Sequence, residues 1–166
     1  MTLPRWDFFN ACRAAFFLSA ALWVVSLCCP VYVTDMDVGP IYDRGWEVLL
    51  FGWAGVFASL DYALELGRYE ADFIGGFAWL ANVLLLLNLR RMWQGRAPNA
   101  VAAWLALPLA ALGLHILYPG LFDRDFGVVG ATKPVYGAYI WAASMLPPLP
   151  ILLVGWLRRF TVRIHG

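Results

Sequence analysis

The stretch AAFFLSAALWVVSLCCPVYV, residues 14–33, contains no charged side chain. Its twenty residues match the length that an α-helix needs to cross the hydrocarbon core of a bilayer, which is about 30 Å thick. Arg5 and Arg13 precede this stretch, as in a segment held in the membrane by its cytoplasmic flank. A cleaved signal peptide is the alternative, but no small-x-small cleavage site precedes Pro30. We therefore predict a signal-anchor helix.

Three further stretches lack acidic and basic residues over a comparable length, and they are Phe73–Leu89, Ala97–Tyr118 and Val135–Leu157. The whole chain is 62% hydrophobic and 14% charged, whereas a soluble domain is about 45–50% apolar and about 25% charged. We predict one membrane domain over residues 1–166, folded as an all-α bundle. It would contain four transmembrane helices, with the N and C termini both in the cytoplasm.

The charged residues divide between the two sides of this arrangement. Eight of the 12 basic residues fall in the cytoplasm: Arg5, Arg13, Arg90, Arg91, Arg96, Arg158, Arg159 and Arg163. Ten of the 11 acidic residues fall outside: Asp35, Asp37, Asp43, Glu47, Asp61, Glu65, Glu70, Asp72, Asp123 and Asp125. An excess of Lys and Arg on the cytoplasmic side orients membrane proteins, so we predict a multi-pass protein of the bacterial inner (plasma) membrane.

The segment Trp46–Leu66 is apolar but too short to be a fifth crossing. Its uncharged core, Val48–Leu60, would form a helix about 20 Å long against a hydrocarbon core of about 30 Å. A fifth crossing would also move more basic residues to the outside. We therefore predict an outer segment over residues 34–72, with an external or re-entrant helix at about 46–66.

This short helix has a regular apolar pattern. Its large apolar residues recur at spacings of three and four: Trp46, Leu49, Trp53, Val56, Phe57, Leu60 and Leu64. The pieces Gly45–Trp53 and Phe77–Leu85 resemble segments of small, uncharacterised bacterial membrane proteins. In those proteins a short helix rich in aromatic residues and glycine precedes a helix with a Trp and an Asn. The resemblance implies an architecture and no activity.

Acidic residues of the outer segment form a candidate surface for a partner or an ion. Asp61 and Glu65 are one helical turn apart, and the set also includes Glu70, Asp72, Asp35 and Asp37. Carboxylates so spaced could ligate Ca²⁺ or attract a basic partner. The alternative is a solvated loop with Glu65 paired to Arg68, which we favour because the spacing of an EF-hand loop is absent. We predict no metal site and no cofactor.

Two polar residues fall within the predicted membrane helices. Asn82 could donate or accept a hydrogen bond to a neighbouring helix, which specifies packing, or it could line a polar path. His115 is close to Tyr118, Pro119 and Gly120, which places it near the outer interface, where a neutral imidazole costs little. Metal binding by His115 would need further ligands, and the sequence supplies none nearby.

The prolines of the last apolar stretch predict a break within it. Pro147 and Pro148 are adjacent, and Pro150 follows. Each proline lacks the backbone donor that a helix interior requires and clashes with the preceding turn. Broken helices line sites in transporters, but no second segment of this chain repeats the pattern. We therefore interpret the break as a structural bend.

Three classes of function fit these observations to different degrees. The first is a non-catalytic inner-membrane protein that acts through protein–protein contacts, as an accessory, assembly or immunity-type subunit. The second is a component of an oligomeric small transporter or channel. The third is a membrane enzyme that uses the outer carboxylates and His115. No spacing typical of a catalytic triad, phosphate loop or zinc site is present, so we predict no enzyme. We expect membrane lipid and a protein partner or a second copy as partners, and no nucleic acid.

Overall fold

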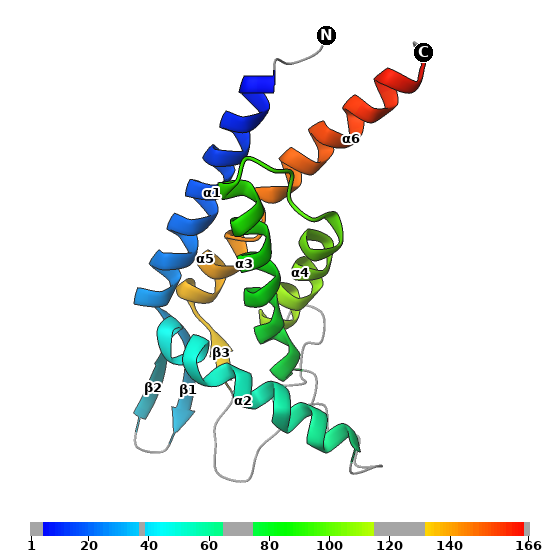
Figure 1. Ribbon diagram of the computed structural model, residues 1–166. Helices are drawn as coiled ribbons and strands as arrows, with labels where there is room; N and C mark the ends of the chain where they lie inside the picture. Colours follow the sequence, from blue (N-terminus) through cyan, green and yellow to red (C-terminus); the bar gives the residue numbers. More distant parts are fainter. Residues whose placement is uncertain (1–4, 37–38, 65–74, 115–131, 165–166) are drawn as a thin grey trace.

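The computed structural model describes residues 5–36, 39–64, 75–114 and 132–164, most of which are helical (Figure 1). Helix α1 is the longest and spans Arg5–Cys28. It ends before Pro30, because the residue ahead of a proline is driven away from the helical conformation. The predicted helix over residues 14–33 is therefore confirmed, but its C-terminal end was placed five residues too far along the chain.

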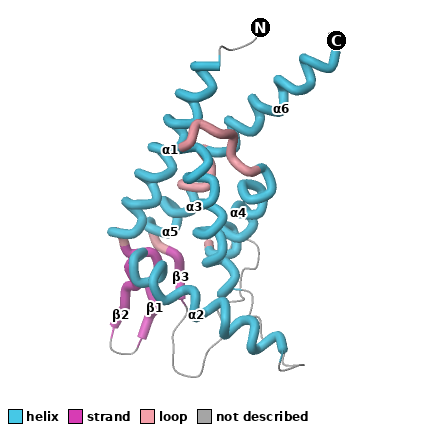
Figure 2. The backbone as a smooth tube through the Cα atoms, viewed as in Figure 1, coloured by secondary structure: helices cyan, strands magenta, loops and turns pink. Residues whose placement is uncertain are grey.

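A small antiparallel sheet follows α1, so the all-α prediction is wrong in this part of the chain. Strand β1 is Pro30–Met36, β2 is Gly39–Arg44 and β3 is Thr132–Pro134, with the spatial order β2-β1-β3. Residues 31–34 are Val-Tyr-Val-Thr, whose β-branched and aromatic side chains favour an extended strand over a helix. Figure 2 shows the sheet at the end of the bundle opposite the two chain ends.

Helix α2, Gly45–Leu64, begins directly after β2. It crosses the end of the bundle beside the sheet and does not run alongside the other helices (Figure 1). The backbone N–H of Gly45 donates to the carbonyl oxygen of Cys29 at 3.0 Å, which ties the start of α2 to the end of α1. The predicted helix at about 46–66 is confirmed as a helix.

The middle of the chain forms an antiparallel helical pair. A 3-10 turn, η2 (Gly75–Trp79), leads into α3 (Leu80–Trp93), and α4 spans Ala100–Gly113. Asn99 begins α4 as its N-cap, where its Oδ1 accepts from the backbone N–H of Ala102 at 3.2 Å. The stretches predicted as crossings at 73–89 and 97–118 are thus helical over much of their length.

The last predicted crossing is broken at its prolines, as expected. Helix α5 is Tyr136–Ala143, and α6 is Pro148–Ile164. Among the described residues, Asp7–Cys28 and Tyr136–Leu157 are each long and apolar enough to cross a membrane. Helices α3 and α4 have 14 residues each and are shorter than such a span. The four-crossing bundle with cytoplasmic termini stays a prediction.

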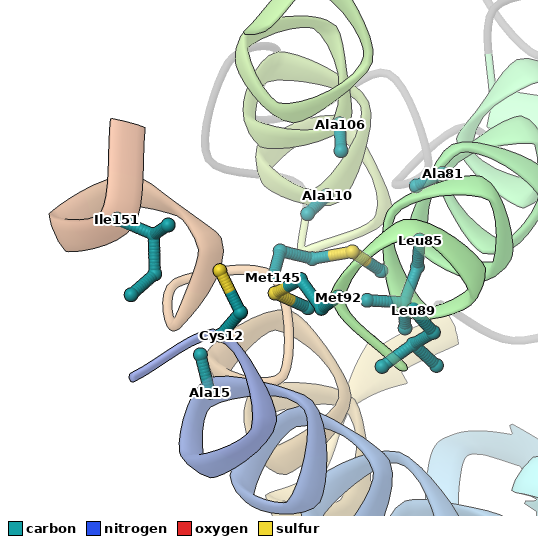
Figure 3. Packing of buried hydrophobic residues seen from close by; sticks show 10 residues of the cluster. All are labelled: Cys12, Ala15, Ala81, Leu85, Leu89, Met92, Ala106, Ala110, Met145 and Ile151. Atoms are coloured by element: carbon teal, nitrogen blue, oxygen red, sulfur yellow. The ribbon is translucent and has the colours of Figure 1, made fainter. Parts of the chain in front are cut away.

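A compact set of small and apolar side chains holds the helices together. Four of the buried residues are alanines, which let the helices approach closely, and two are methionines. Figure 3 shows these side chains converging from α1, α3, α4 and the α5–α6 region. The cluster consists of Cys12, Ala15, Ala81, Leu85, Leu89, Met92, Ala106, Ala110, Met145 and Ile151.

Candidate functional site

The most distinctive polar group among the described residues is the side chain of Asn82, which is 6% exposed. Its Oδ1 accepts hydrogen bonds from the indole N–H of Trp23 at 3.1 Å and from that of Trp141 at 2.8 Å. Because an indole N–H only donates, the amide oxygen must face both rings, and the orientation of the amide follows. One side chain of α3 therefore joins α1 and α5.

The other half of the same amide continues the network toward α2. The Nδ2 of Asn82 donates to the carbonyl oxygen of Trp79 at 3.3 Å, and the indole N–H of Trp79 donates to the carbonyl oxygen of Leu49 at 3.0 Å. A Cβ on Gly52 would overlap the Trp79 ring, so only glycine lets α2 approach this indole. The network thus links four separate segments of the chain.

Buried serines provide further polar contacts in the same region. The hydroxyl of Ser19 donates to the carbonyl oxygen of Ser144 at 2.7 Å, across α1 and the end of α5. The hydroxyls of Ser26 and Ser144 each donate to a carbonyl oxygen three residues earlier in the chain. These hydroxyls and the Asn82 oxygen all have hydrogen-bond partners within the protein, so the network fits a role in positioning helices.

At the end of the bundle near the chain termini, aromatic rings surround an arginine. The guanidinium of Arg13 lies 4.8 Å from the ring centre of Phe9 and 5.4 Å from that of Trp93. The Nε of Arg91 donates to the carbonyl oxygen of Ala97 at 2.8 Å. The contact of Arg13 with Trp93 joins α1 to the last residue of α3, and the bond from Arg91 to Ala97 lies within the α3–α4 connection.

At the sheet end, Tyr32 of β1 connects the sheet to the bundle. Its hydroxyl donates to the carbonyl oxygen of Gly113 at 2.8 Å. Burial, and then the charge of Asp43, raises the pKa of Tyr32 to about 12. The phenol therefore stays protonated at neutral pH and remains a donor to the end of α4.

The carboxyl of Asp43 makes the stability of this end depend on pH. Its pKa is raised from 3.8 by partial burial and then by the charge of Glu47. A raised pKa means that the folded state holds this proton more tightly than the unfolded chain. The protonated carboxyl of Asp43 therefore contributes its whole share of the free energy of unfolding below about pH 4. This stabilisation is lost as the pH rises through the folded-state pKa.

We expect Asp43→Asn to gain stability relative to the wild-type protein as the pH is raised from 4 to 7. The reason is that asparagine has no charge to desolvate or to be repelled by Glu47. Thermal unfolding in mild detergent over this pH range measures the difference. If the stability difference between the variant and the wild-type protein stays constant from pH 4 to 7, the pKa of Asp43 is not raised in the folded protein.

The structure describes the backbone of two of the six acidic residues predicted as a partner or ion surface, so this surface stays a prediction. Asp35 is in β1, opposite Pro40 in the hairpin, whereas Asp61 is in the last turn of α2. The C-terminal end of α2 points away from the hairpin (Figure 1). Asp37, Glu65, Glu70, Asp72 and His115 lie outside the described residues. Over the ranges that the structure describes, no three His, Cys, Asp or Glu residues group as metal ligands would.

Sequence reasoning identified Asn82 as a residue that would bond to a neighbouring helix, but it did not identify the partners. Trp23 and Trp141 each lie 59 residues from Asn82 in the chain, and their indoles gave no sign of a shared acceptor. The contact from Tyr32 to Gly113 was missed because the strand that carries Tyr32 was not predicted.

Comparison with protein families, characterised proteins and solved structures finds no match to this chain.

Proposed function

We propose that this chain is a multi-pass protein of the bacterial inner membrane that acts through protein–protein contacts and catalyses no reaction. In this role it would be an accessory, assembly or immunity-type subunit. The observation that carries the proposal is the distribution of polar and apolar side chains between the inside and the outside of the fold.

That distribution differs from the one in a soluble domain mainly on the outside, because large apolar side chains are exposed while several polar ones are buried. Asn82, Asn88, Ser19, Ser26 and Ser144 are buried. Large apolar side chains cover the outside of the helices, among them Phe17, Leu18, Val24, Leu86, Leu87, Trp104, Leu153 and Leu157, all more than 40% exposed. Soluble monomers rarely expose contiguous apolar patches of this kind, so the surface supports an environment of lipid or of other membrane proteins.

Helix α4 supports a protein neighbour on part of this surface. Its buried face is made of alanines that pack inward, whereas Val101 and Trp104 on the other face are 67% and 63% exposed. A 14-residue helix is about 21 Å long, so it does not cover a hydrocarbon core of about 30 Å. Association with another protein is one way in which a short apolar helix is accommodated in a bilayer.

The hydrogen bonds of Asn82 disfavour the transporter alternative. A polar path needs groups that can exchange bonds with a passing ion or solute. The Asn82 oxygen instead accepts from two indoles, and its amide nitrogen donates to the backbone. This side chain therefore supports a fixed helix arrangement.

A photo-crosslinking amino acid at Trp104 tests the proposed contact. We expect a discrete protein adduct from position 104 in intact membranes, and no such adduct from Leu86 on α3, which is also exposed. The mass of the adduct distinguishes a second copy from another protein, and either one supports the proposal. Adducts with lipid alone at both positions would contradict the protein contact.

The outer acidic residues remain a second proposed contact. A crosslinker at Asp61, at the far end of α2, tests whether the same partner reaches that surface. With the crosslinker at position 104, the yield of the adduct is then compared between Asp61→Asn and the otherwise wild-type protein, which shows whether the negative charge contributes. An equal yield of adduct in the two would count against an electrostatic role.

A further inference from the structure

Helix α2 carries a continuous stripe of large apolar side chains that no described residue covers. Its residues recur at spacings of four and three, which keeps them on one side of the helix. Their exposed fractions range from 43% to 63%, and the rings of Trp53 and Phe57 pack edge to face at 5.9 Å. No charged residue occurs between positions 48 and 60. The stripe consists of Trp46, Leu50, Trp53, Phe57 and Leu60.

A neighbouring side of α2, which carries Gly45, Leu49 and Gly52, faces the bundle. Gly52 lies against the ring of Trp79, and the carbonyl oxygen of Leu49 accepts from the Trp79 indole. At the start of the helix, Gly45 lies so close to Ser26 of α1 that a Cβ there would overlap the Ser26 carbonyl oxygen. The stripe therefore lies beside the face of α2 that packs on the bundle and is not part of it, while the helix itself crosses the bundle end (Figure 1).

The lengths of α1 and α3 give two separate estimates of how deep α2 would lie in a membrane. Arg13 and Ser26 are thirteen residues apart in α1, which corresponds to about 20 Å along the helix. Arg90 of α3 and Trp79, the N-cap of α3, are eleven residues apart, which corresponds to about 17 Å. If these arginines mark the inner edge of a hydrocarbon core of about 30 Å, the first half of α2 lies about 10–13 Å inside the outer edge.

Exposed apolar residues occur on both sides of the junction between α1 and α2. Val24 and Val25, in the last turns of α1, are 52% and 49% exposed. Trp46, which is 44% exposed, follows Gly45, and the backbone of Gly45 abuts Ser26 of α1. Apolar residues that could meet acyl chains are therefore present on α1 and on the start of α2.

We propose that α2 is an interfacial helix whose stripe binds the lipid of the outer leaflet, with its aromatic rings at the boundary between headgroups and acyl chains. Interfacial helices bury their apolar face about 5–10 Å into this boundary, and the depth given by α1 and α3 lies at the deep end of this range or slightly beyond it. Tryptophan is enriched at this boundary, and the stripe contains two. This inference rests on the proposed membrane location and goes beyond it, because it assigns lipid as the ligand of α2.

The charges at the two ends of α2 agree with this placement. Glu47 in the first turn accepts from the backbone N–H of Arg44 at 2.7 Å, and Asp61 is in the last turn. Both positions flank the uncharged part of the helix.

Spin labels at single cysteines test the proposal in vesicles of phosphatidylethanolamine and phosphatidylglycerol. The background protein has Cys12, Cys28 and Cys29 replaced by alanine. Labels on Phe57→Cys and Leu50→Cys report on the stripe, and Leu86→Cys of α3 reports on the bundle surface. Lys133→Cys, at an exposed charged position of β3, is the aqueous reference. Accessibility to oxygen indicates lipid, and accessibility to a soluble nickel chelate indicates water.

We expect the labels at positions 57, 50 and 86 to collide with oxygen at least several-fold more often than with the nickel chelate, and position 133 to show the reverse. If position 57 behaves like position 133 while position 86 stays in lipid, α2 is not interfacial but the membrane location stands. If position 86 is also in water, the proposed function fails. Low accessibility to both reagents at position 57 would show that protein covers the stripe, which overturns the assignment of lipid.

Discussion

Asn82→Leu is expected to destabilise the protein by about 2–4 kcal/mol, because it leaves two partly buried indole donors without an acceptor and an unsatisfied buried donor costs about 1–3 kcal/mol. Leucine is close to asparagine in size, so little cavity is created. The loss should exceed the average interhelical hydrogen bond in membranes, about 0.6 kcal/mol, since one oxygen serves both Trp23 and Trp141. Titration from mild detergent into SDS measures the free energy of unfolding.

A mutant cycle separates the hydrogen bonds from simple packing. In a background with Trp23→Phe and Trp141→Phe, the two indole donors are absent, so Asn82→Leu should cost far less than it does in the wild-type protein. The cycle isolates the shared interaction because each change removes one side of it. An equal cost in both backgrounds would show that Asn82 acts through its shape and not as an acceptor.

Gly45→Ala is expected to destabilise the protein by about 1–3 kcal/mol, toward the upper end of the usual range for an added methyl group. The added Cβ would meet the backbone of Ser26 and Leu27, which cannot rotate away as a flexible side chain can. The start of α2 must then move away from the end of α1, weakening the bond from Gly45 to Cys29. The SDS titration measures the loss.

Gly155→Ala is the matched control for this effect. Gly155 is in the interior of α6, and no atom lies within 4 Å of the position that its Cβ would occupy. Alanine is favoured over glycine inside a helix by about 0.5–1 kcal/mol, so this variant should be slightly more stable than the wild-type protein. Equal effects at positions 45 and 155 would contradict the close approach of α2 to α1.

Local signals in the sequence were enough to predict several elements. The apolar run after Arg13 gave α1, the adjacent Pro147 and Pro148 gave the break between α5 and α6, and the three-four pattern gave α2. Each signal depends on residues close together in the chain. The end of α1 was misplaced because hydropathy continues past Pro30 although the helix does not.

The candidate site was only partly predictable, because it depends on residues that are far apart in the chain. The acidic residues of the outer segment share a charge and a stretch of sequence, and this suggested that they share a surface. The structure places Asp35 in a hairpin and Asp61 in the last turn of α2, and the other four lie outside the described residues, so the shared surface stays a prediction. Charge identifies candidate residues, but their placement depends on the elements that carry them.

The sequence by itself determined that this chain is made largely of apolar helices, with basic residues gathered in a few flanking segments. The length of an apolar stretch and the position of a proline affect only the nearby backbone, so their effects could be predicted directly from the sequence. Only the tertiary structure decided that β1 pairs with β3 about a hundred residues away, that Asn82 accepts from two tryptophans, and that α2 turns its aromatic stripe outward. A strand edge, a hydrogen-bond acceptor and a helix face each take whichever partner the folded chain brings near.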